Sequence, residues 1–129
     1  MRLEHVAFAL PDPPAAAAWY VEHLGFRVLR AGGPPTHAHF LVPDGGGTML
    51  EIFCDAEHPP PDRRGVHPMH AHLAFAVEDI DAAVAAMVAA GGVAEGAIAT
   101  SPAGDRYAIV RDPWGVPLQL ITRSMPFGD

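Results

Sequence analysis

The chain has 129 residues, which fits one domain, and half of them are hydrophobic, enough for a packed core. Its net charge is −7, and its eight basic residues are all arginines, so a P-loop lysine and a lysine Schiff base are excluded. Apart from the pair Arg63-Arg64 these arginines are scattered, and no basic stripe of a nucleic-acid-binding surface is visible. No apolar run approaches the roughly 20 residues of a membrane helix, no signal peptide is visible, and the single Cys54 cannot form an internal disulfide, so we expect a cytoplasmic protein that binds neither membranes nor nucleic acids.

The first half of the chain predicts a strand, a helix and three more strands. The segment from His5 to Asp12 reads HVAFALPD, with Asp12 in the position of a helix N-cap and Pro13 suited to the first helical turn. Gly25 follows the apolar helical stretch, where glycine commonly ends a helix. The expected elements are a strand at 3–10, a helix at 14–24 and strands at 26–30, 37–42 and 48–53.

The middle of the chain predicts a linker. Residues 55–69 contain Pro59-Pro60-Pro61 and Pro68, and proline at that density does not support a helix or a central strand. The sequence therefore predicts a boundary between two halves.

The second half repeats the first. HLAFAVED, from His72 to Asp79, shares five of eight residues with HVAFALPD at an offset of 67. Asp44 precedes Glu51 by seven residues, and Asp112 precedes Gln119 by the same seven. The expected elements are a strand at 71–77, a helix at 80–90 and strands at 95–99, 106–111 and 116–122. The sequence thus predicts an α+β fold of two βαβββ modules within one domain of residues 1–129, with module one at 1–54, module two at 70–123 and a tail at 124–129.

Each module is expected to place two polar side chains away from its helix. Because side chains alternate across a strand, His5 shares a face with Ala7, and His72 shares one with Ala74. Glu51 and Gln119 similarly point away from the apolar faces of the closing strands. If the modules face each other, four polar groups converge on a cavity for which the alanines leave room. The residues expected to line this cavity are Ala7, Met49, Phe53, Ala74 and Tyr107.

Glu51 lies within the apolar run Met-Leu-Glu-Ile-Phe, where an unpaired carboxylate is costly to bury. A divalent metal held by the two imidazoles and this carboxylate would compensate its charge. A direct hydrogen bond from one or both histidines, without metal, would also do so. Residue spacing does not separate these two interpretations.

Four segments resemble the vicinal oxygen chelate superfamily, which includes glyoxalase I, methylmalonyl-CoA epimerase, extradiol dioxygenases, fosfomycin-resistance enzymes and bleomycin-binding proteins. The resemblance covers Met1 to about Arg123 and implies two βαβββ modules in tandem that form a cupped, curved mixed sheet. The matching segments are Leu3-Glu4-His5-Val6-Ala7, Trp19 to Phe26 (WYVEHLGF), His72 to Val77 (HLAFAV) and Asp112 to Leu120 (DPWGVPLQL).

In members of that superfamily that use a metal, the ligands lie on the first and last strands of each module. Carried over, they are His5, Glu51, His72 and Gln119, holding a divalent ion such as Ni, Zn, Co, Mn or Fe(II). The family often has a carboxylate where this chain has Gln119, and an amide cannot act as a base. The resemblance therefore implies that Glu51, at the equivalent place in module one, is a metal ligand or the catalytic base.

Three functions follow from this resemblance. The leading one is a metal-dependent glyoxalase-like isomerase, lyase or epimerase acting on a small substrate with vicinal oxygens, where the ion polarises a carbonyl and Glu51 moves a proton. The second is an extradiol-type dioxygenase using non-haem Fe(II), because two histidines and one carboxylate suit that ion. The third is a metal-free protein that binds an antibiotic or metabolite. We expect a small-molecule partner and a homodimer.

Overall fold

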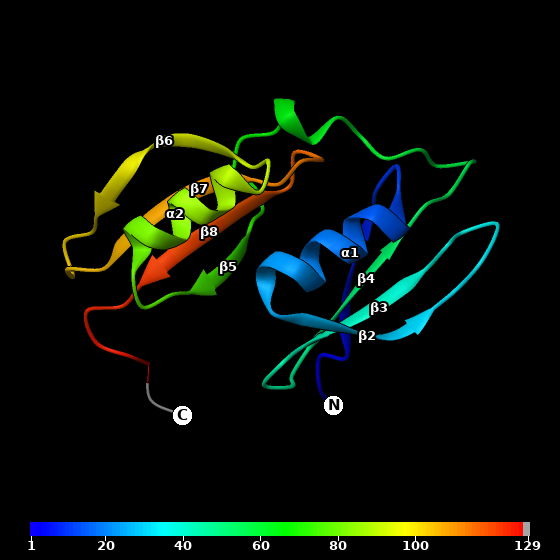
Figure 1. Cartoon of the computed structure of the whole chain (residues 1–129), viewed down its shortest axis with the longest axis horizontal. Helices are drawn as coiled ribbons and strands as arrows, with labels where there is room; N and C mark the ends of the chain where they lie inside the picture. The colour runs from blue at the N-terminus through cyan, green and yellow to red at the C-terminus, as the bar shows by residue number, and fades with distance from the viewer. Residues whose placement is uncertain (128–129) are drawn as a thin grey trace. The chain divides into compact units, whose positions relative to one another are not determined.

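Each half of the chain folds into a four-stranded sheet with one helix on one face, in the computed structural model that describes residues 1–127 (Figure 1). The chain divides into a first unit of residues 1–61 and a second unit that begins at Asp62. Among the described residues, no helix is both long and apolar enough to span a membrane. The two-module α+β fold predicted from the sequence is confirmed.

The first unit contains one helix and one mixed sheet. The strand order is β1-β4-β3-β2, with β1 and β4 parallel and the other neighbours antiparallel. The helix α1 packs on β2, β3 and β4. The elements are β1 (His5–Ala9), α1 (Pro13–Leu24), β2 (Phe26–Ala31), β3 (His39–Pro43) and β4 (Met49–Phe53).

The start and end of α1 follow from local chemistry. The Asp12 carboxylate accepts a hydrogen bond from the backbone N–H of Ala15 at 3.2 Å and so caps the first turn. Gly25 ends the helix at a φ of 67°, in the left-handed region that costs glycine little. Strand β2 starts directly after it, as the sequence predicts.

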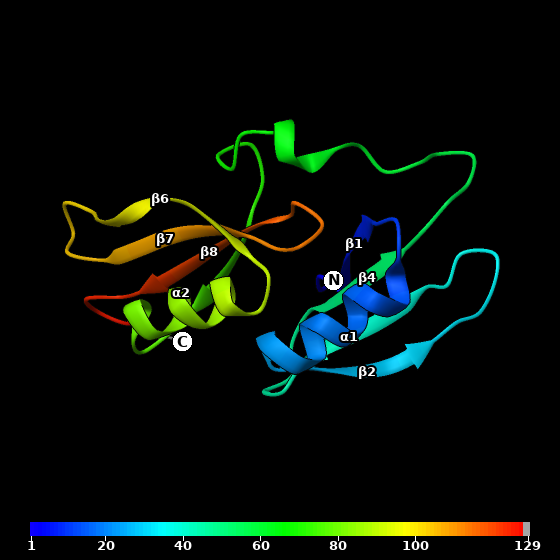
Figure 2. The ribbon, with the colours of Figure 1, turned by 45° about the horizontal axis from the view of Figure 1, so that its top comes forward.

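The second unit repeats this arrangement. Its strand order is β5-β8-β7-β6, with β5 and β8 parallel, and α2 packs on β6, β7 and β8. Figure 2 shows β2 and β6 each at the edge of its own sheet. The elements are η1 (Arg63–Gly65, a 3-10 turn), β5 (Leu73–Ala76), α2 (Ile80–Ala89), β6 (Val93–Thr100), β7 (Arg106–Arg111) and β8 (Pro117–Thr122).

Strand pairing shows that the two units are equivalent at the predicted site residues. Ala7 pairs with Glu51 across β1 and β4, and Ala74 pairs with Gln119 across β5 and β8. Glu51 and Gln119 therefore occupy the same position in the two copies, as their shared spacing from an aspartate predicts.

The helix-facing sides of the closing strands form the two cores. Leu50 and Ile52 are buried in the first unit, and Leu118 and Leu120 are buried in the second. Glu51 and Gln119, which alternate with these residues, are only partly buried. The apolar faces thus hold each helix, and the polar side chains lie on the opposite faces of the sheets.

Residues 62–69 of the predicted linker pack against the second unit, and we call them the strap. The Arg111 side chain donates hydrogen bonds to the carbonyl oxygens of Arg63 and Val66, and the Arg64 side chain donates to that of Pro113. Gly115 makes this approach possible, because a Cβ there would lie 2.8 Å from Cγ of Arg64. The prolines of the predicted linker reveal neither the short 3-10 turn Arg63–Gly65 nor the residues against which this segment packs.

Candidate functional site

In the first unit, His5 lies between two carboxylates. Its Nδ1 contacts the Glu4 carboxylate, to which only a protonated Nδ1 can donate a hydrogen bond. Its Nε2 lies 3.3 Å from Oε2 of Glu51, which lies on β4 two residue pairs further along the sheet. The first unit thus brings two of the predicted ligands together and adds Glu4, which the sequence reasoning did not assign.

These carboxylates change the acidity of His5. The hydrogen bond to Glu4 raises the pKa of the imidazole, and the negative charges of Glu4 and Glu51 raise it further, against an opposing effect of desolvation. A metal ion would have to compete with a proton for Nε2. Any metal affinity that depends on His5 should therefore fall as the pH is lowered.

A pocket of about 270 Å³ adjoins this pair. The rings of Phe40 and His5 are nearly perpendicular, with centroids 5.7 Å apart, and the Arg30 guanidinium lies 5.6 Å from the centroid of the Phe40 ring. Of the predicted lining residues of this unit, Met49 lines the pocket, Ala7 is exposed, and Phe53 is half-buried beside Ala9. The lining residues are Glu4, His5, Leu29, Arg30, Phe40 and Met49.

In the second unit, a backbone carbonyl orients His72. Nδ1 of His72 lies 2.9 Å from the carbonyl oxygen of Pro68, and because a carbonyl only accepts, Nδ1 carries the proton. Nε2 then has a free lone pair, the form in which neutral imidazole binds metals. Both equivalent histidines are thus held through Nδ1, one by a carboxylate and the other by the main chain.

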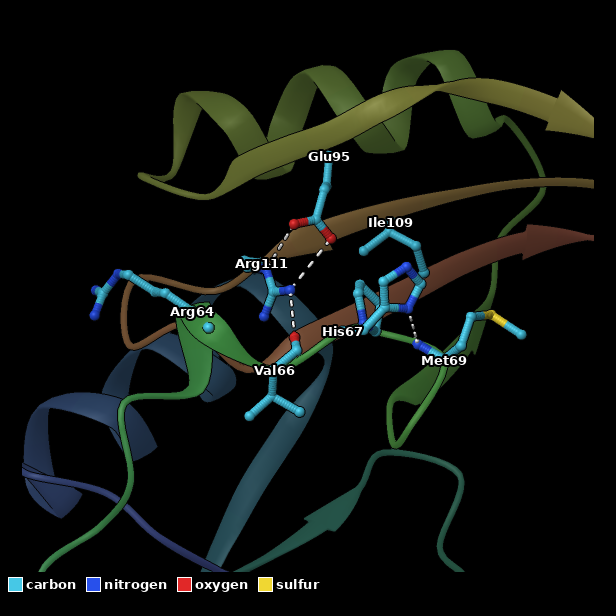
Figure 3. Close-up of a pocket in the computed structure, with 9 residues that line it drawn as sticks. Arg64, Val66, His67, Met69, Glu95, Ile109 and Arg111 are labelled. Carbon is cyan, nitrogen blue, oxygen red and sulfur yellow. Dashed lines mark hydrogen bonds and ion pairs between the residues drawn. The ribbon is translucent and has the colours of Figure 1, made fainter.

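A second pocket, of about 440 Å³, adjoins the predicted ligands of the second unit (Figure 3). Ile109, which lines it, is the strand partner of Gln119 across β7 and β8 and therefore shares its face of the sheet. Pro68, which holds His72, also lines it. Ala74 is exposed, and Tyr107 lies half-buried two residues before Ile109. The lining residues are Arg64, Gly65, Val66, His67, Pro68, Met69, Glu95, Ile109 and Arg111.

The first unit holds two side-chain atoms at a separation that one divalent ion could span. The 3.3 Å between Nε2 of His5 and Oε2 of Glu51 is close to the roughly 3.4 Å that separates two ligands of a tetrahedral metal with bonds of about 2.1 Å. The free Nε2 of His72 and the amide oxygen of Gln119 are further donors. In the described part of each unit, no group of three or more His, Cys, Asp or Glu side chains is arranged to hold a metal ion. The four-residue ligand set stays a prediction.

Other aspartate, histidine and cysteine side chains of the two units have structural roles. The Asp112 carboxylate accepts hydrogen bonds from the backbone N–H groups of Trp114 and Val116 and so fixes the turn before β8. Nδ1 of His39 donates to the carbonyl of His37, and the Cys54 thiol lies 3.3 Å from the carbonyl oxygen of Thr36.

Residues 2–120 match the model of the Glyoxalase/Bleomycin resistance protein/Dioxygenase superfamily. The chain belongs to this superfamily. A glyoxalase family protein from Bacillus cereus has the same fold, with a TM-score of 0.79 at 18% identity over 95% of this chain and 93% of its own. The resemblance expected from the four sequence segments is therefore confirmed.

Two relatives within the superfamily have names that indicate different functions. A 2-epi-5-epi-valiolone epimerase from Actinomyces sp is 30% identical over 98% of this chain and 80% of its own length. TnmS3, an antibiotic binding protein from Streptomyces sp. CB03234, is 26% identical with a TM-score of 0.72, over 96% of this chain and 97% of its own. The relatives of this chain therefore include a protein named as an enzyme and a protein named as a binding protein.

Proposed function

We propose that this protein is a divalent-metal-dependent enzyme that moves a proton beside a carbonyl group of a small substrate with vicinal oxygens, as in an epimerisation or isomerisation. The observation that carries the proposal is the Glu51 carboxylate, held 3.3 Å from Nε2 of His5 on the face of the sheet opposite α1. The 30% identity to a named epimerase supports it.

The proposed ligands are His5, Glu51, His72 and Gln119. A bound divalent ion would act as a Lewis acid on the substrate oxygens and so acidify the neighbouring C–H bond. Glu4 and the Pro68 carbonyl hold the two imidazoles in the tautomer with Nε2 unprotonated, because each accepts a hydrogen bond from Nδ1.

Glu51 is the proposed base. Its carboxylate takes the proton as the C–H bond breaks, the electron pair of that bond moves towards the carbonyl, and return of a proton to carbon restores the starting charge. Return of this proton from Glu51 to a neighbouring atom gives an isomer. Epimerisation requires a proton from water to reach the opposite face of that carbon, while Glu51 releases its own proton to solvent. Gln119, an amide, cannot accept this proton, so the proton transfer belongs to Glu51 of the first unit alone.

Proton exchange tests the proposal even where the product is unidentified. The purified protein, with Ni²⁺, Zn²⁺, Co²⁺ or Mn²⁺, is incubated in D₂O with hydroxyketones, hydroxyaldehydes and 2-epi-5-epi-valiolone, and loss of the C–H signal is followed by NMR. We expect metal-dependent exchange, reduced about 10²- to 10⁴-fold in Glu51→Gln. Glu57→Gln, an exposed carboxylate of the same unit, is the matched control.

Metal titration of the same variants separates the roles of Glu51. If Glu51→Gln binds metal like the unaltered protein but exchanges no deuterium, Glu51 is the base. If the variant loses both metal and exchange, Glu51 is a metal ligand. Absence of metal binding by the unaltered protein, or full exchange activity in Glu51→Gln, would contradict the proposal.

A second candidate is a metal-free binding protein. The direct contact between His5 and Glu51 favours it, because this contact partly compensates the carboxylate without an ion. The 26% identity to an antibiotic binding protein points in the same direction. Micromolar binding of an antibiotic, unchanged by a chelator and accompanied by no deuterium exchange, would support this candidate over the enzyme.

A further inference from the structure

The second unit contains a buried arginine whose bonding is unusually complete. The Arg111 side chain is 8% exposed, and all five of its N–H donors have acceptors. Nε and Nη2 donate to the two carboxylate oxygens of Glu95 at 3.1 and 3.3 Å. The remaining donors bind main-chain carbonyl oxygens of the strap and of Gly115. A guanidinium with this bonding is fixed in position as well as neutralised.

Two of these bonds fasten the strap. Arg111 donates to the carbonyl oxygens of Arg63 at 2.8 Å and Val66 at 2.7 Å, the first and last residues of one turn of the strap. Figure 3 shows the guanidinium between the Glu95 carboxylate and the Val66 carbonyl. Glu95 comes from β6, so the sheet itself orients the group that holds the strap.

The strap also contains the residue that orients His72. Pro68, two residues after Val66, is buried, and its carbonyl oxygen accepts the Nδ1–H of His72. A hydrogen bond from the Met69 N–H to Nδ1 of His67 fixes the intervening turn. A chain of contacts therefore runs from Glu95 through Arg111 and Val66 to Pro68 and His72.

We propose that Arg111 and Glu95 are positioning residues, which hold the strap so that the Pro68 carbonyl keeps His72 in the Nδ1–H tautomer with Nε2 available to bind metal. The part of this inference that concerns metal rests on the proposed function. The part that concerns the tautomer rests on the hydrogen bonds alone. An imidazole released from Pro68 would exchange between its two tautomers, and only one of them can use Nε2 as a ligand.

The first experiment measures the tautomer in metal-free protein. Long-range ¹H–¹⁵N NMR at a pH where imidazole is neutral reports which ring nitrogen of His72 is protonated, with the signal assigned by its loss in His72→Gln. We expect the Nδ1–H form in the unaltered protein and a shift towards the Nε2–H form in Arg111→Met. The matched control is Arg106→Met, on the same strand, whose side chain is 46% exposed and pairs with Asp81.

The second experiment measures attachment of the strap. Trypsin can cut after Arg63 and Arg64 when the strap is released, and Arg111→Met removes two hydrogen bonds that hold it. We expect cleavage there to become about tenfold faster or more in the variant, the change that corresponds to the loss of two ordinary hydrogen bonds. Arg111→Lys keeps the charge but not the five donors, so its cleavage rate should lie between the rates of Arg111→Met and the unaltered protein.

Metal titration with Zn²⁺ or Ni²⁺ completes the test. We expect about 10- to 100-fold weaker binding in Arg111→Met, the usual effect of losing a residue that orients a ligand. If the unaltered protein binds no metal while the tautomer and cleavage rate still respond to Arg111→Met, the proposed function fails and the positioning role stands.

If Arg111→Met releases the strap but leaves the His72 tautomer unchanged, the positioning role is overturned. An unchanged cleavage rate in Arg111→Met would also overturn it. If Arg111→Met does not fold, Glu95→Gln, which alters a half-exposed side chain, provides the same readouts. A Glu95→Gln protein with unchanged tautomer, cleavage and metal affinity would exclude Glu95 from the role. Arg111→Lys would then decide the role of Arg111 by the same measurements.

Discussion

The replacement Glu4→Gln tests how the first unit holds His5. In the unaltered protein, Nδ1 of His5 donates to the Glu4 carboxylate, whereas Nδ1 of His72 donates to a neutral carbonyl. The amide oxygen of glutamine can also accept from Nδ1, so Glu4→Gln gives His5 the kind of partner that His72 has. The replacement thus removes a charge while keeping a hydrogen bond.

The size of the effect follows from exposure. Loss of a residue that orients a metal-binding histidine weakens metal affinity about 10- to 100-fold. The Glu4 side chain is 53% exposed, so water screens its charge and the effect should lie at the lower end, about tenfold. Glu4→Ala removes the acceptor altogether, and we expect a loss closer to 100-fold.

Competition titration with a chromogenic chelator measures these affinities for Zn²⁺ at one pH. Glu22→Gln, an exposed carboxylate of α1, is the control and should leave the affinity unchanged. Equal affinities in Glu4→Ala and the unaltered protein, in a protein that does bind Zn²⁺, would refute the role of Glu4. A larger loss in Glu4→Gln than in Glu4→Ala would refute the reasoning about the retained acceptor.

Two further predictions concern stability, measured by urea unfolding. Leu118 is fully buried, so Leu118→Ala should lower the free energy of unfolding by about 2–5 kcal/mol. Val88→Ala, at an exposed position of α2, should change it by less than about 0.5 kcal/mol. Similar losses of stability in both variants would contradict the assigned core. Hydrogen bonds from the Ser124 N–H and the Arg123 side chain lower the pKa of Asp105 from its ordinary 3.8, so its stabilising effect is present above that value and is lost as the pH falls through the lowered pKa. Asp105→Asn should therefore be less stable than the unaltered protein at neutral pH, with a stability difference that shrinks as the pH falls below 3.8. A stability difference that does not change with pH would show that the ionised Asp105 carboxylate is not its source.

Much of the fold could be predicted because the repeat specifies it twice. HVAFALPD and HLAFAVED each combine a strand pattern with a capping aspartate, and both helices begin after those aspartates, at Pro13 and Ile80. The equal spacing to Glu51 and Gln119 predicted their equivalence, which the strand pairs with Ala7 and Ala74 confirm. Local rules sufficed here because each element is determined by its own residues.

The contacts that hold the candidate site could not be predicted in this way. The expected strand at 95–99 is part of a longer β6 with a shift in pairing between Glu95 and Ala99, where Gly96 has a φ of 79°. No sequence period reveals that Glu95 pairs with Arg111, because the two lie on different strands and meet only through the pairing of β6 with β7. Adjacent residues of a regular strand point to opposite faces, which also hid the contact between Glu4, just before β1, and His5.

The two histidines differ in how mutation can alter them over evolution. Any single substitution at Glu4 changes the partner of His5 directly. The partner of His72 is a main-chain oxygen, which every amino acid at position 68 would still provide. Selection on this second histidine must therefore act at a distance, through side chains such as Arg111 that determine where the main chain lies.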